Sequence, residues 1–346
     1  MRKTIFITGG AGYIGVHTLV SLVEAGYKPL VLDNFSNSRP EALVRVEELT
    51  GHEIDFIEGD IRNTDLLVRL FVDQAMKGEP VSCVLHLAAL KAVGESVALP
   101  LSYYDVNVTG TLSLLEAMRH AEIKNMVFSS SATVYCPGTD LPYTEHHVLG
   151  PSNPYGHSKA MVERILQDYC FADQGFAAIA LRYFNPIGAH RSGRIGDHPQ
   201  GVPNNLFPYI TRTAIGSLPS LPVFGADYPT TDGTGVRDYI HVSDLAAGHV
   251  KAIDWLLDRG DRGFHSFNLG TGRGTSVLEL LKAFELTSGM PVPYRICDRR
   301  PGDVAAAWAD VSSANRILKW TAIYTIEDMC RDGWRWQRNN PNGYGS

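Results

Sequence analysis

A glycine-rich turn near the start of the chain separates a short apolar run from a helical pattern. The run is Thr4–Thr8, and residues 16–25 then place apolar side chains at helical spacing before Gly26, a typical helix stop. The glycines between them are Gly9, Gly10, Gly12 and Gly15. Glycine allows a tight turn and lets backbone N–H groups approach a pyrophosphate at the helix N-terminus. The pattern predicts a dinucleotide-binding βα unit, with a glycine-rich turn that holds no ligand as the alternative.

Strand and helix patterns continue to alternate up to about residue 188, which is typical of a doubly wound parallel sheet. The predicted strands are 29–32, 55–61, 82–89, Asn125–Ser131 and 177–186, and a long helix is expected over 103–121. Residues 189–237 are richer in Gly, Pro, Asn and Asp. We therefore predict an α/β fold with a Rossmann domain over 1–188, to which the chain returns around 236–270. A smaller mixed α/β lobe over 189–346 is expected to bind the substrate.

Acidic residues end two of the predicted strands. Asp33 lies about 20 positions beyond the glycines, where a carboxylate accepts hydrogen bonds from ribose hydroxyls and repels a 2′-phosphate, which favours NAD over NADP. The loop after it adds polar candidates at Asn34, Asn37 and Ser38. Asp60 is placed to meet an adenine amino group, but it is equally placed to cap the predicted helix Thr64–Met76.

A tyrosine and a lysine lie four residues apart at the start of another predicted helix. Asn153 can cap this helix and Pro154 suits its first position, so Tyr155 and Lys159 would share one face. Lowering a tyrosine pKa from about 10 to about 7 needs roughly 4 kcal/mol. An ammonium about 4 Å away supplies about that much at an effective dielectric constant of 20. The spacing predicts a tyrosine base, although Tyr-x-x-x-Lys also occurs by chance. Ser131 ends a predicted strand, where it could bond a reacting hydroxyl.

Composition excludes several other functions. A net charge of −6 without blocks of like charge argues against a nucleic-acid surface. The five cysteines are far apart, and the twelve histidines show no ligand spacing, so we expect reduced thiols and no metal site. The first apolar run is too short for a signal peptide, and no apolar run reaches the ~18 residues of a membrane span. We expect a soluble cytoplasmic protein that binds neither membrane nor nucleic acid.

These residues resemble the extended short-chain dehydrogenase/reductase family, and the resemblance extends over nearly the whole chain. It is carried by residues 8–15, Asp33, residues 59–61, Ser131 and the Tyr155/Lys159 pair. Further segments resemble the sugar-nucleotide 4-epimerases of that family: 90–96, 129–135, 182–188, 203–206 and 232–241. The resemblance implies a bound NAD that is regenerated in each cycle, epimerisation of UDP-hexoses at C4 through a 4-keto sugar, and a homodimer.

The resemblance also implies roles for individual residues. Tyr155 would exchange a proton with the sugar 4-hydroxyl, Ser131 would hold the 4-oxygen, and Lys159 would hold the ribose and depress the tyrosine pKa. Cofactor contacts are implied for Gly9, Gly12, Tyr13, Ile14, Gly15, Asp33, Asn34, Asn37, Ser38, Asp60, Ile61, Leu87, Ala88, Lys91, Asn107, Tyr155, Lys159 and Phe184. Substrate contacts are implied for Lys91, Ser131, Ala132, Thr133, Tyr155, Tyr183, Phe184, Asn185, Asn204, Asn205, Leu206, Val223, Phe224, Arg237, Arg300, Asp303 and Ala307.

Three positions depart from the epimerase pattern. Val106 replaces an asparagine common beside the cofactor, and Cys136 replaces a common glycine. Ala307 stands where epimerases restricted to glucose and galactose tend to carry tyrosine. Because the missing phenol leaves room for an N-acetyl group, we expect turnover of UDP-GlcNAc and UDP-GalNAc as well.

Some alternatives stay open at this stage. A 4,6-dehydratase or decarboxylase could share the scaffold, but dehydratases usually carry Asp-Glu where Ala132 and Thr133 stand here. A non-catalytic NAD-sensing protein is the other alternative, although such proteins commonly lose the tyrosine or the lysine. Arg299 and Arg300 suit a diphosphate, whereas Arg237 could simply pair with its neighbour Asp238. A helix over 320–337 is expected to pack its tryptophans into a core.

Overall fold

The computed structural model describes residues 2–259, 261–300 and 302–345. Its contacts divide the chain into two compact units. Unit 1 comprises Met1–Cys136, Val148–Arg182 and Ala246–Phe267, and unit 2 comprises Pro137–His147, Tyr183–Leu245 and Asn268–Ser346. The division into 1–188 and 189–346 that the sequence suggests stays a prediction.

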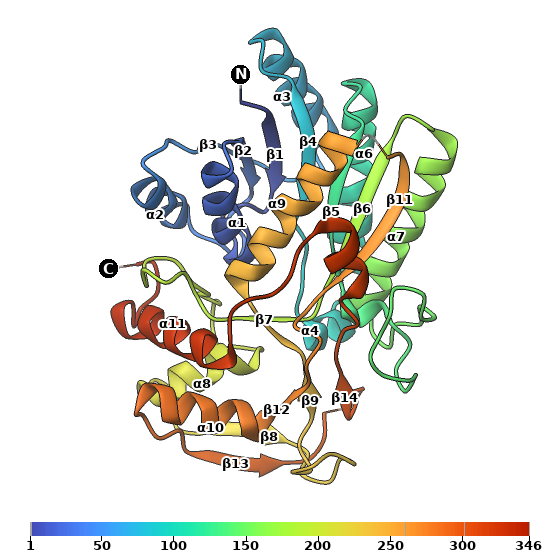
Figure 1. The fold of residues 1–346 in the computed structure, drawn as a ribbon. Helices are drawn as coiled ribbons and strands as arrows, with labels where there is room; N and C mark the ends of the chain where they lie inside the picture. The colour runs from blue at the N-terminus through green and yellow to red at the C-terminus, as the bar shows by residue number, and fades with distance from the viewer. Residues whose placement is uncertain (1, 260, 301, 346) are drawn as a thin grey trace. The chain divides into compact units, whose positions relative to one another are not determined.

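A seven-stranded sheet with strand order β11-β6-β5-β4-β1-β2-β3 forms the centre of unit 1 (Figure 1). Its strands are β1 (Thr4–Thr8), β2 (Lys28–Asp33), β3 (Asp55–Glu58), β4 (Val81–His86), β5 (Asn125–Ser131), β6 (Ala177–Tyr183) and β11 (Gly263–Leu269). The pairs from β5 through β4, β1 and β2 to β3 are parallel. The predicted Rossmann-type sheet is thus confirmed, and in such a sheet ligands collect at the carboxyl ends of the strands.

Helices accompany these strands in the expected alternation. They are α1 (Tyr13–Glu24), α2 (Pro40–Thr50), α3 (Thr64–Met76), α4 (Val93–Ala98), α5 (Pro100–Tyr104), α6 (Gly110–His120), the short 3₁₀ turn η2 (Ala132–Val134), α7 (Pro154–Ala172) and α9 (Val242–Arg259). Buried residues of α3, α6 and α7, such as Leu67, Met118 and Leu166, pack with the sheet around Phe6 and Phe128. The expected 103–121 helix is interrupted by a π turn, η1 (Asp105–Thr109), which separates α5 from α6.

Helix α7 begins as the sequence predicts. The Asn153 side chain accepts a 2.9 Å hydrogen bond from the Gly156 N–H, and Pro154 is the first helical residue. Lys159 and Val162 face the interior of unit 1. The cap therefore fixes the register in which this helix presents its side chains to the strand ends.

Unit 2 has a second core of its own. Its elements are β7 (Asn185–Ile187), α8 (Leu206–Ala214), β8 (Leu221–Phe224), β9 (Val236–Arg237), β10 (Tyr239–His241), β12 (Thr275–Ser276), α10 (Val277–Ser288), β13 (Tyr294–Cys297), β14 (Ala306–Ala307), the π turn η3 (Ala314–Leu318) and α11 (Ile326–Asn339). Strands β8 and β13 pair in parallel, and Phe207, Leu221 and Phe284 belong to the core that covers them. The predicted 320–337 helix begins only at Ile326, but Trp320 and Trp336 are buried as expected.

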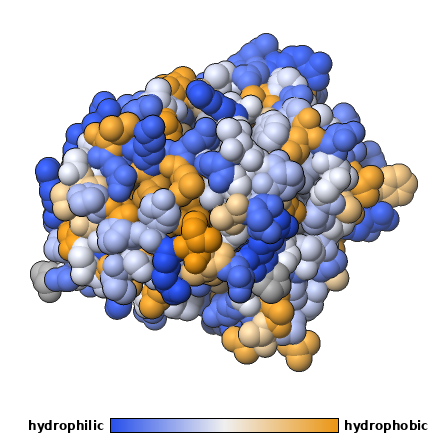
Figure 2. All heavy atoms as spheres, turned by 90° about the horizontal axis from the view of Figure 1, so that it is seen from below, coloured by the Kyte–Doolittle hydropathy of each residue, from blue (hydrophilic) through white to orange (hydrophobic). Residues whose placement is uncertain are grey.

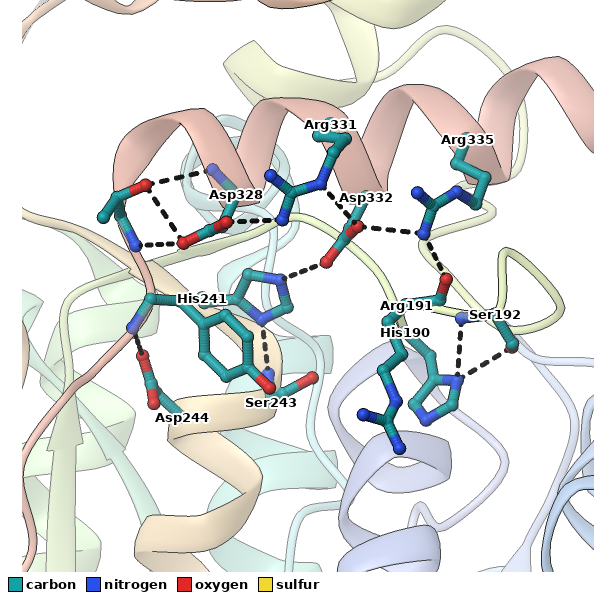
Figure 3. Close-up of polar contacts among 12 residues, drawn as sticks. His190, Arg191, Ser192, His241, Ser243, Asp244, Asp328, Arg331, Asp332 and Arg335 are labelled. Carbon is teal, nitrogen blue, oxygen red and sulfur yellow. Dashed lines mark hydrogen bonds and ion pairs between the residues drawn. The ribbon is translucent and has the colours of Figure 1, made fainter.

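A buried carboxylate anchors helix α11 to the rest of unit 2 (Figure 3). Asp332 lies 3.5 Å from His241 Nε2 at the end of β10, and it also accepts from Arg335 at 3.2 Å. Arg335 in turn donates to the backbone carbonyl of Arg191. The His241 Nδ1 accepts from the Ser243 N–H, so the ring must carry its proton on Nε2, facing Asp332.

The surface carries both apolar and polar residues. On the face drawn in Figure 2, apolar residues lie in small groups among polar ones, as is usual where a protein meets water. Within the described residues, every helix is too short or too polar to cross a membrane. The five cysteines are all thiols, and three of them are buried: Cys83, Cys170 and Cys330.

Candidate active site

The glycine turn after β1 is shaped by close backbone contacts. Gly9 has φ +72°, and a Cβ atom there would lie 2.8 Å from the backbone nitrogen of Ala88. At Gly15 a Cβ atom would lie 2.5 Å from the Gly10 carbonyl oxygen. Helix α1 therefore starts directly against the turn, and the first N–H groups of a helix have no partner within it. This cradle fits the pyrophosphate of a dinucleotide.

Asp33 connects this turn to the loop that follows β2. One carboxylate oxygen accepts from the Ala11 N–H at 2.9 Å, and the other accepts from the Phe35 N–H and the Ser38 hydroxyl. Each carboxylate oxygen has more than one acceptor site, so ribose hydroxyls can still bind. Ser38 therefore orients Asp33, which is a role that the sequence alone did not suggest.

Asp60 takes part in an ion pair and does not cap a helix. Arg62 donates to it from Nε at 2.9 Å and Nη2 at 2.7 Å, and these hydrogen bonds lower the pKa of Asp60 to about 2. The cap of α3 is Asn63, whose side chain accepts from the Leu66 N–H at 3.0 Å. The alternative that Asp60 caps α3 is wrong, because the N-cap position, Asn63, lies three residues after it. Asn34 Nδ2 lies 3.4 Å from the Asp60 carboxylate.

A directed chain of hydrogen bonds crosses the carboxyl end of β4. The Thr111 hydroxyl donates to the Asn107 carbonyl, so it accepts from His86 Nε2, which lies 2.9 Å away. His86 Nδ1 must then accept from Thr8 at 2.7 Å, and Thr8 accepts from the Ala88 N–H. His86 is therefore neutral, in agreement with a pKa that burial lowers to about 3.

The Asn107 amide is fully engaged inside unit 1. It accepts from the Leu90 N–H at 2.8 Å, donates to the Leu90 carbonyl at 3.0 Å and donates to Ser158 at 2.9 Å. The Ser158 hydroxyl donates to the Tyr155 carbonyl at 2.7 Å. Asn107 thus joins the loop that carries the exposed Lys91 to the start of α7.

Ser131, Tyr155 and Lys159 come together at the carboxyl end of β5. The Ser131 hydroxyl hydrogen-bonds the Tyr155 phenol and also accepts from the Thr133 hydroxyl at 3.0 Å. Lys159 is 2 % exposed and donates to the Ser129 carbonyl at 2.6 Å. Its Nζ lies 4.8 Å from the centre of the Phe128 ring and 5.9 Å from that of Tyr155. A hydroxyl, a phenol and an amine therefore line one strand end.

The protonation of this group differs from the expectation. Burial raises the pKa of Tyr155, and the hydrogen bond with Ser131 opposes that rise. Burial lowers the pKa of Lys159 to about 7, against the attraction of Glu163. The chain by itself thus favours a neutral phenol, whereas the sequence suggested a depressed tyrosine pKa. A depressed tyrosine pKa requires an ammonium close to the phenol, but burial acts on both groups and Lys159 donates to the Ser129 carbonyl.

The charged candidates of unit 2 find partners of their own. Arg237 donates to the carbonyls of Val236 and Val304 at 2.9 Å and lies 3.4 Å from Asp303. Asp238 accepts instead from the N–H groups of Thr271 and Gly272, so the alternative that Arg237 simply pairs with Asp238 is wrong. These two neighbours on an extended chain point their side chains apart.

The two consecutive arginines have different surroundings. Arg299 pairs with Asp227 at 2.7 Å and stacks on Tyr228, with 4.2 Å between guanidinium and ring centre. Arg300 stacks on Phe224 at 4.1 Å and is exposed. Arg300 thus keeps its charge available for a ligand, whereas Arg299 is used within unit 2.

The remaining unit 2 candidates differ in exposure. Tyr183, Phe184 and Val223 are buried, and Asn185, Asn204 and Asn205 are exposed. Leu206 begins α8 and Ala307 ends β14, where it pairs with Arg237 of β9.

Known proteins are similar to this chain in both sequence and fold. The family model described as GDP-mannose 4,6 dehydratase matches residues 6–333. The UDP-glucose 4-epimerase of Bacillus subtilis is 56% identical over 342 residues, which are 99% of this chain and 99% of the relative. The chain belongs to the UDP-glucose 4-epimerase family. This family is part of the extended short-chain dehydrogenases/reductases, so the resemblance inferred from the sequence is confirmed.

Solved members of the UDP-glucose 4-epimerase family have the same fold. The enzyme of Bifidobacterium longum, in complex with NAD+ and UDP, is 49% identical with a TM-score of 0.94, over 99% of this chain and 100% of that one. The enzyme of Stenotrophomonas maltophila, with bound NAD and formylated UDP-arabinopyranose, is 46% identical with a TM-score of 0.94. That match covers 98% of this chain and 99% of the other. NAD is thus the cofactor of close structural relatives.

Sequence reasoning missed several residues that hold this site. Ser158 and His86 fix the start of α7 and the end of β4, and Arg62 neutralises Asp60. Only Arg62 had a local signal, because it lies two residues from its partner. Ser158 also accepts from Asn107, and His86 bonds Thr8 and Thr111; these partners lie on other elements, and no spacing in the sequence reveals them.

Replacing the buried Lys159 should stabilise the folded chain, by an amount that depends on pH. Between pH about 7 and 10.5 the unfolded chain holds the Lys159 proton and the folded chain does not, so stability rises with pH in this window. Below pH about 7 the full penalty of burying the charge is present. We expect Lys159→Met, without cofactor, to be more stable than the parent at pH 7, and this gain to shrink by up to roughly 1.4 kcal/mol per pH unit above that.

Denaturant unfolding at pH 7 and pH 9 measures this effect. Lys251→Met on the exposed side of α9 is the matched control and should show no such trend. A gain for Lys159→Met that is independent of pH would contradict the buried, deprotonatable amine.

Proposed function

We propose that this chain interconverts UDP-glucose and UDP-galactose by inverting C4 of the hexose, with NAD as a bound cofactor. The observation that carries this proposal is the group of Ser131, Tyr155 and Lys159 at the end of β5. The glycine cradle of the same unit and the 56% identity to a UDP-glucose 4-epimerase support it.

Tyr155 is the acid and base of the reaction. The reaction starts when the Tyr155–Lys159 pair has lost one proton and Tyr155 is a phenolate. The phenolate oxygen then takes the proton of the sugar 4-hydroxyl while hydride leaves C4. The Ser131 hydroxyl, already bonded to this phenol, donates to the sugar 4-oxygen. The 4-keto sugar then turns its other face, and Tyr155 returns the proton as the hydride comes back. A proton positioned in this way typically contributes about 10²–10⁴-fold in rate.

The remaining residues of unit 1 suit a nicotinamide dinucleotide. A bound NAD would supply the acceptor, and then the donor, of the hydride exchanged with C4. Asp33 would hold the adenosine ribose and disfavour a 2′-phosphate. The Gly9–Gly15 turn would hold the pyrophosphate. Asn107 holds the loop of Lys91 in place rather than offering a spare donor of its own.

The residues after Ser131 favour an epimerase over a dehydratase. Elimination of water across C5 and C6 needs an additional acid and base beside the sugar. Ala132 has no such group, and the Thr133 hydroxyl donates to Ser131. The matching family model is named after a dehydratase, but it describes the scaffold that both kinds of enzyme share. Ala132 and Thr133, in contrast, bear on whether water can be eliminated.

Unit 2 provides groups suited to a nucleoside diphosphate. The planar fork of Arg300 can bond two phosphate oxygens, and Phe224 fixes its plane by stacking. The Asp303 carboxylate can accept from sugar hydroxyls, and the exposed Asn204 and Asn205 amides can donate to phosphate or accept from hydroxyls. We assign the UDP moiety to these residues, with Arg237 held in place by the carbonyls of Val236 and Val304.

Replacement of the phenol tests the proposal. The purified chain should contain NAD and should equilibrate UDP-glucose with UDP-galactose without an added oxidant. We expect Tyr155→Phe to retain NAD and to lose about 10²–10⁴-fold in kcat. Tyr169→Phe, on the same helix, is the control and should keep parental activity. Undiminished turnover by Tyr155→Phe would refute the assigned role.

We further propose that the chain epimerises UDP-GlcNAc and UDP-GalNAc. Ala307 is a small side chain at the end of β14, paired with the strand of Arg237. A phenol at this position would fill space that the alanine leaves open. The size of this one side chain can change the preference between hexose and N-acetylhexosamine substrates only modestly, by about 1–3 kcal/mol of binding free energy.

The variant Ala307→Tyr tests this substrate range. We expect it to lower kcat/KM for UDP-GlcNAc by about 10–200-fold while changing kcat/KM for UDP-glucose much less. Ala307→Ser, which adds little volume, is the control. Absent acetamido turnover in the parent, or equal effects on both substrates, would defeat the proposal.

We also propose that the chain forms a homodimer. Neighbouring helices α4, α5 and α7 carry strongly exposed apolar side chains, with Val97 64% exposed, Leu101 81% and Met161 46%. Apolar side chains grouped on adjacent helices are typical of subunit interfaces. A second copy with the same face would cover them in a two-fold symmetric contact.

Sedimentation equilibrium checks the assembly. The parent should sediment at twice the mass of one chain, and Leu101→Lys should shift it toward the monomer. Leu286→Lys, an equally exposed leucine at the end of α10, should leave the mass unchanged. A monomeric parent would exclude the homodimer.

A further inference from the structure

A fully buried ion pair lies one helical turn beyond Lys159. Glu163 on α7 and Arg182 on β6 are 0% and 3% exposed. The contact is bidentate, with Arg182 Nε 3.0 Å from one carboxylate oxygen and Nη2 2.7 Å from the other. Two apolar side chains would fill the same space without the several kcal/mol that each desolvated charge costs. The pair therefore calls for a reason other than packing.

Glu163 continues the row of reacting side chains along α7. Tyr155, Lys159 and Glu163 follow one another at intervals of four residues, so they lie on one face of the helix. Strand β5 contacts this row at successive positions. The Ser129 carbonyl accepts from Lys159, and the Ser130 hydroxyl donates to Glu163. The carboxylate is thus one turn from the amine and two turns from the phenol.

Among the described residues, few charged or titratable groups lie around Lys159. From β4, His86 faces it as a neutral ring, because its hydrogen bonds and its lowered pKa both exclude the charged form. From β5 come the Ser129 carbonyl and the Phe128 ring. On α7 itself lie Tyr155 and Glu163. The carboxylate is the group that raises the pKa of the amine against the effect of burial.

The groups around Glu163 are equally defined. Arg182 and the Ser130 hydroxyl bond its oxygens, and Lys159 lies one turn away. Arg182 also donates to the Tyr135 hydroxyl at 3.1 Å, with its guanidinium 5.0 Å from the centre of that ring. Arg182, which is itself held by Tyr135, therefore keeps the Glu163 carboxylate in one orientation.

We propose that Glu163 is a positioning residue for epimerisation, whose carboxylate keeps the proton on Lys159 when the Tyr155–Lys159 pair loses one proton. In the NAD-loaded protein, unlike in the chain by itself, the proton then leaves from the phenol, and the pair becomes phenolate and ammonium. The alternative product of the same loss is phenol and neutral amine, which cannot take a proton from the sugar. The two forms contain equally many protons, so the pair titrates as one unit and the carboxylate decides between them. This inference rests on the function proposed above.

A paired apolar variant separates this role from simple packing. In Glu163→Met/Arg182→Met both charges are replaced together, so no unpaired charge stays buried. Arg182→Lys is the control, because it changes the pair but keeps the carboxylate. Each NAD-loaded protein is assayed for kcat/KM with UDP-glucose from about pH 5 to 10, after circular dichroism and bound NAD confirm the fold.

The expected result has two parts. The double variant should lose about tenfold or more of the plateau in kcat/KM, because loss of one pKa unit of bias shifts the two forms tenfold. Its acid-limb apparent pKa should also move to lower pH, because the lost carboxylate is the charge that raises the pKa of the amine, whereas the guanidinium lost with it pairs with Glu163. Arg182→Lys should stay near the parent in both. A folded, NAD-loaded double variant with an unchanged apparent pKa would overturn the proposal, whatever its plateau.

A measurement on the parent keeps the proposal testable if the double variant does not fold. The difference in ultraviolet tyrosinate absorbance between the parent and Tyr155→Phe, both NAD-loaded, reports the phenolate directly. We expect this signal to appear with the same apparent pKa as the acid limb of activity. A signal that appears only at the pH of ordinary tyrosines would refute the role of Glu163. A chain without epimerase activity would instead refute the proposed function, and the absorbance would still report on the pair.

Discussion

An amine buried inside unit 1 is the constraint on which the rest of the site depends. Lys159 is almost without solvent, so its charge must be stabilised by fixed protein groups rather than by water. The Ser129 carbonyl, the Phe128 ring and Glu163 supply that stabilisation from β5 and from α7 itself. Each of them needs the helix in one register against the strand, and the cap at Asn153 sets that register. Chemistry and packing are therefore settled by the same few contacts.

The parts of the fold that the sequence predicts are those with local causes. The first strand, the glycine turn, the strand Asn125–Ser131 and the capped start of α7 follow from neighbouring residues, and all of them are present. Asp60 shows the limit of local signals, because helix α3 is capped by Asn63, which lies closer to the helix. Glu163 and Arg182 show another, because residues on a helix and on the following strand meet only after the chain has folded. Burial, which no residue pattern measures, reversed the expected direction of the Tyr155 pKa.

Residue types were easier to anticipate than their partners. Two neighbouring arginines suited a diphosphate, yet Arg299 pairs with Asp227 whereas Arg300 stacks on Phe224 with its charge exposed. Arg237 is held by backbone carbonyls and not by the aspartate beside it. In each case the sequence supplied a cation, and the three-dimensional surroundings decided whether that cation is available to a ligand.

The π turn η1 makes the long helix from Pro100 to His120 sensitive to deletions. A π turn holds one residue more than the α-helical turn it replaces, and each residue of an α-helix turns the chain by about 100°. Loss of a single residue in this turn would close it into an ordinary α-helix and rotate the whole of α6. Leu114 and Met118 would then leave the core, and the Asn107 amide would no longer face Leu90. Chains of this family that differ in length are thus expected to keep this stretch intact and to vary in their loops.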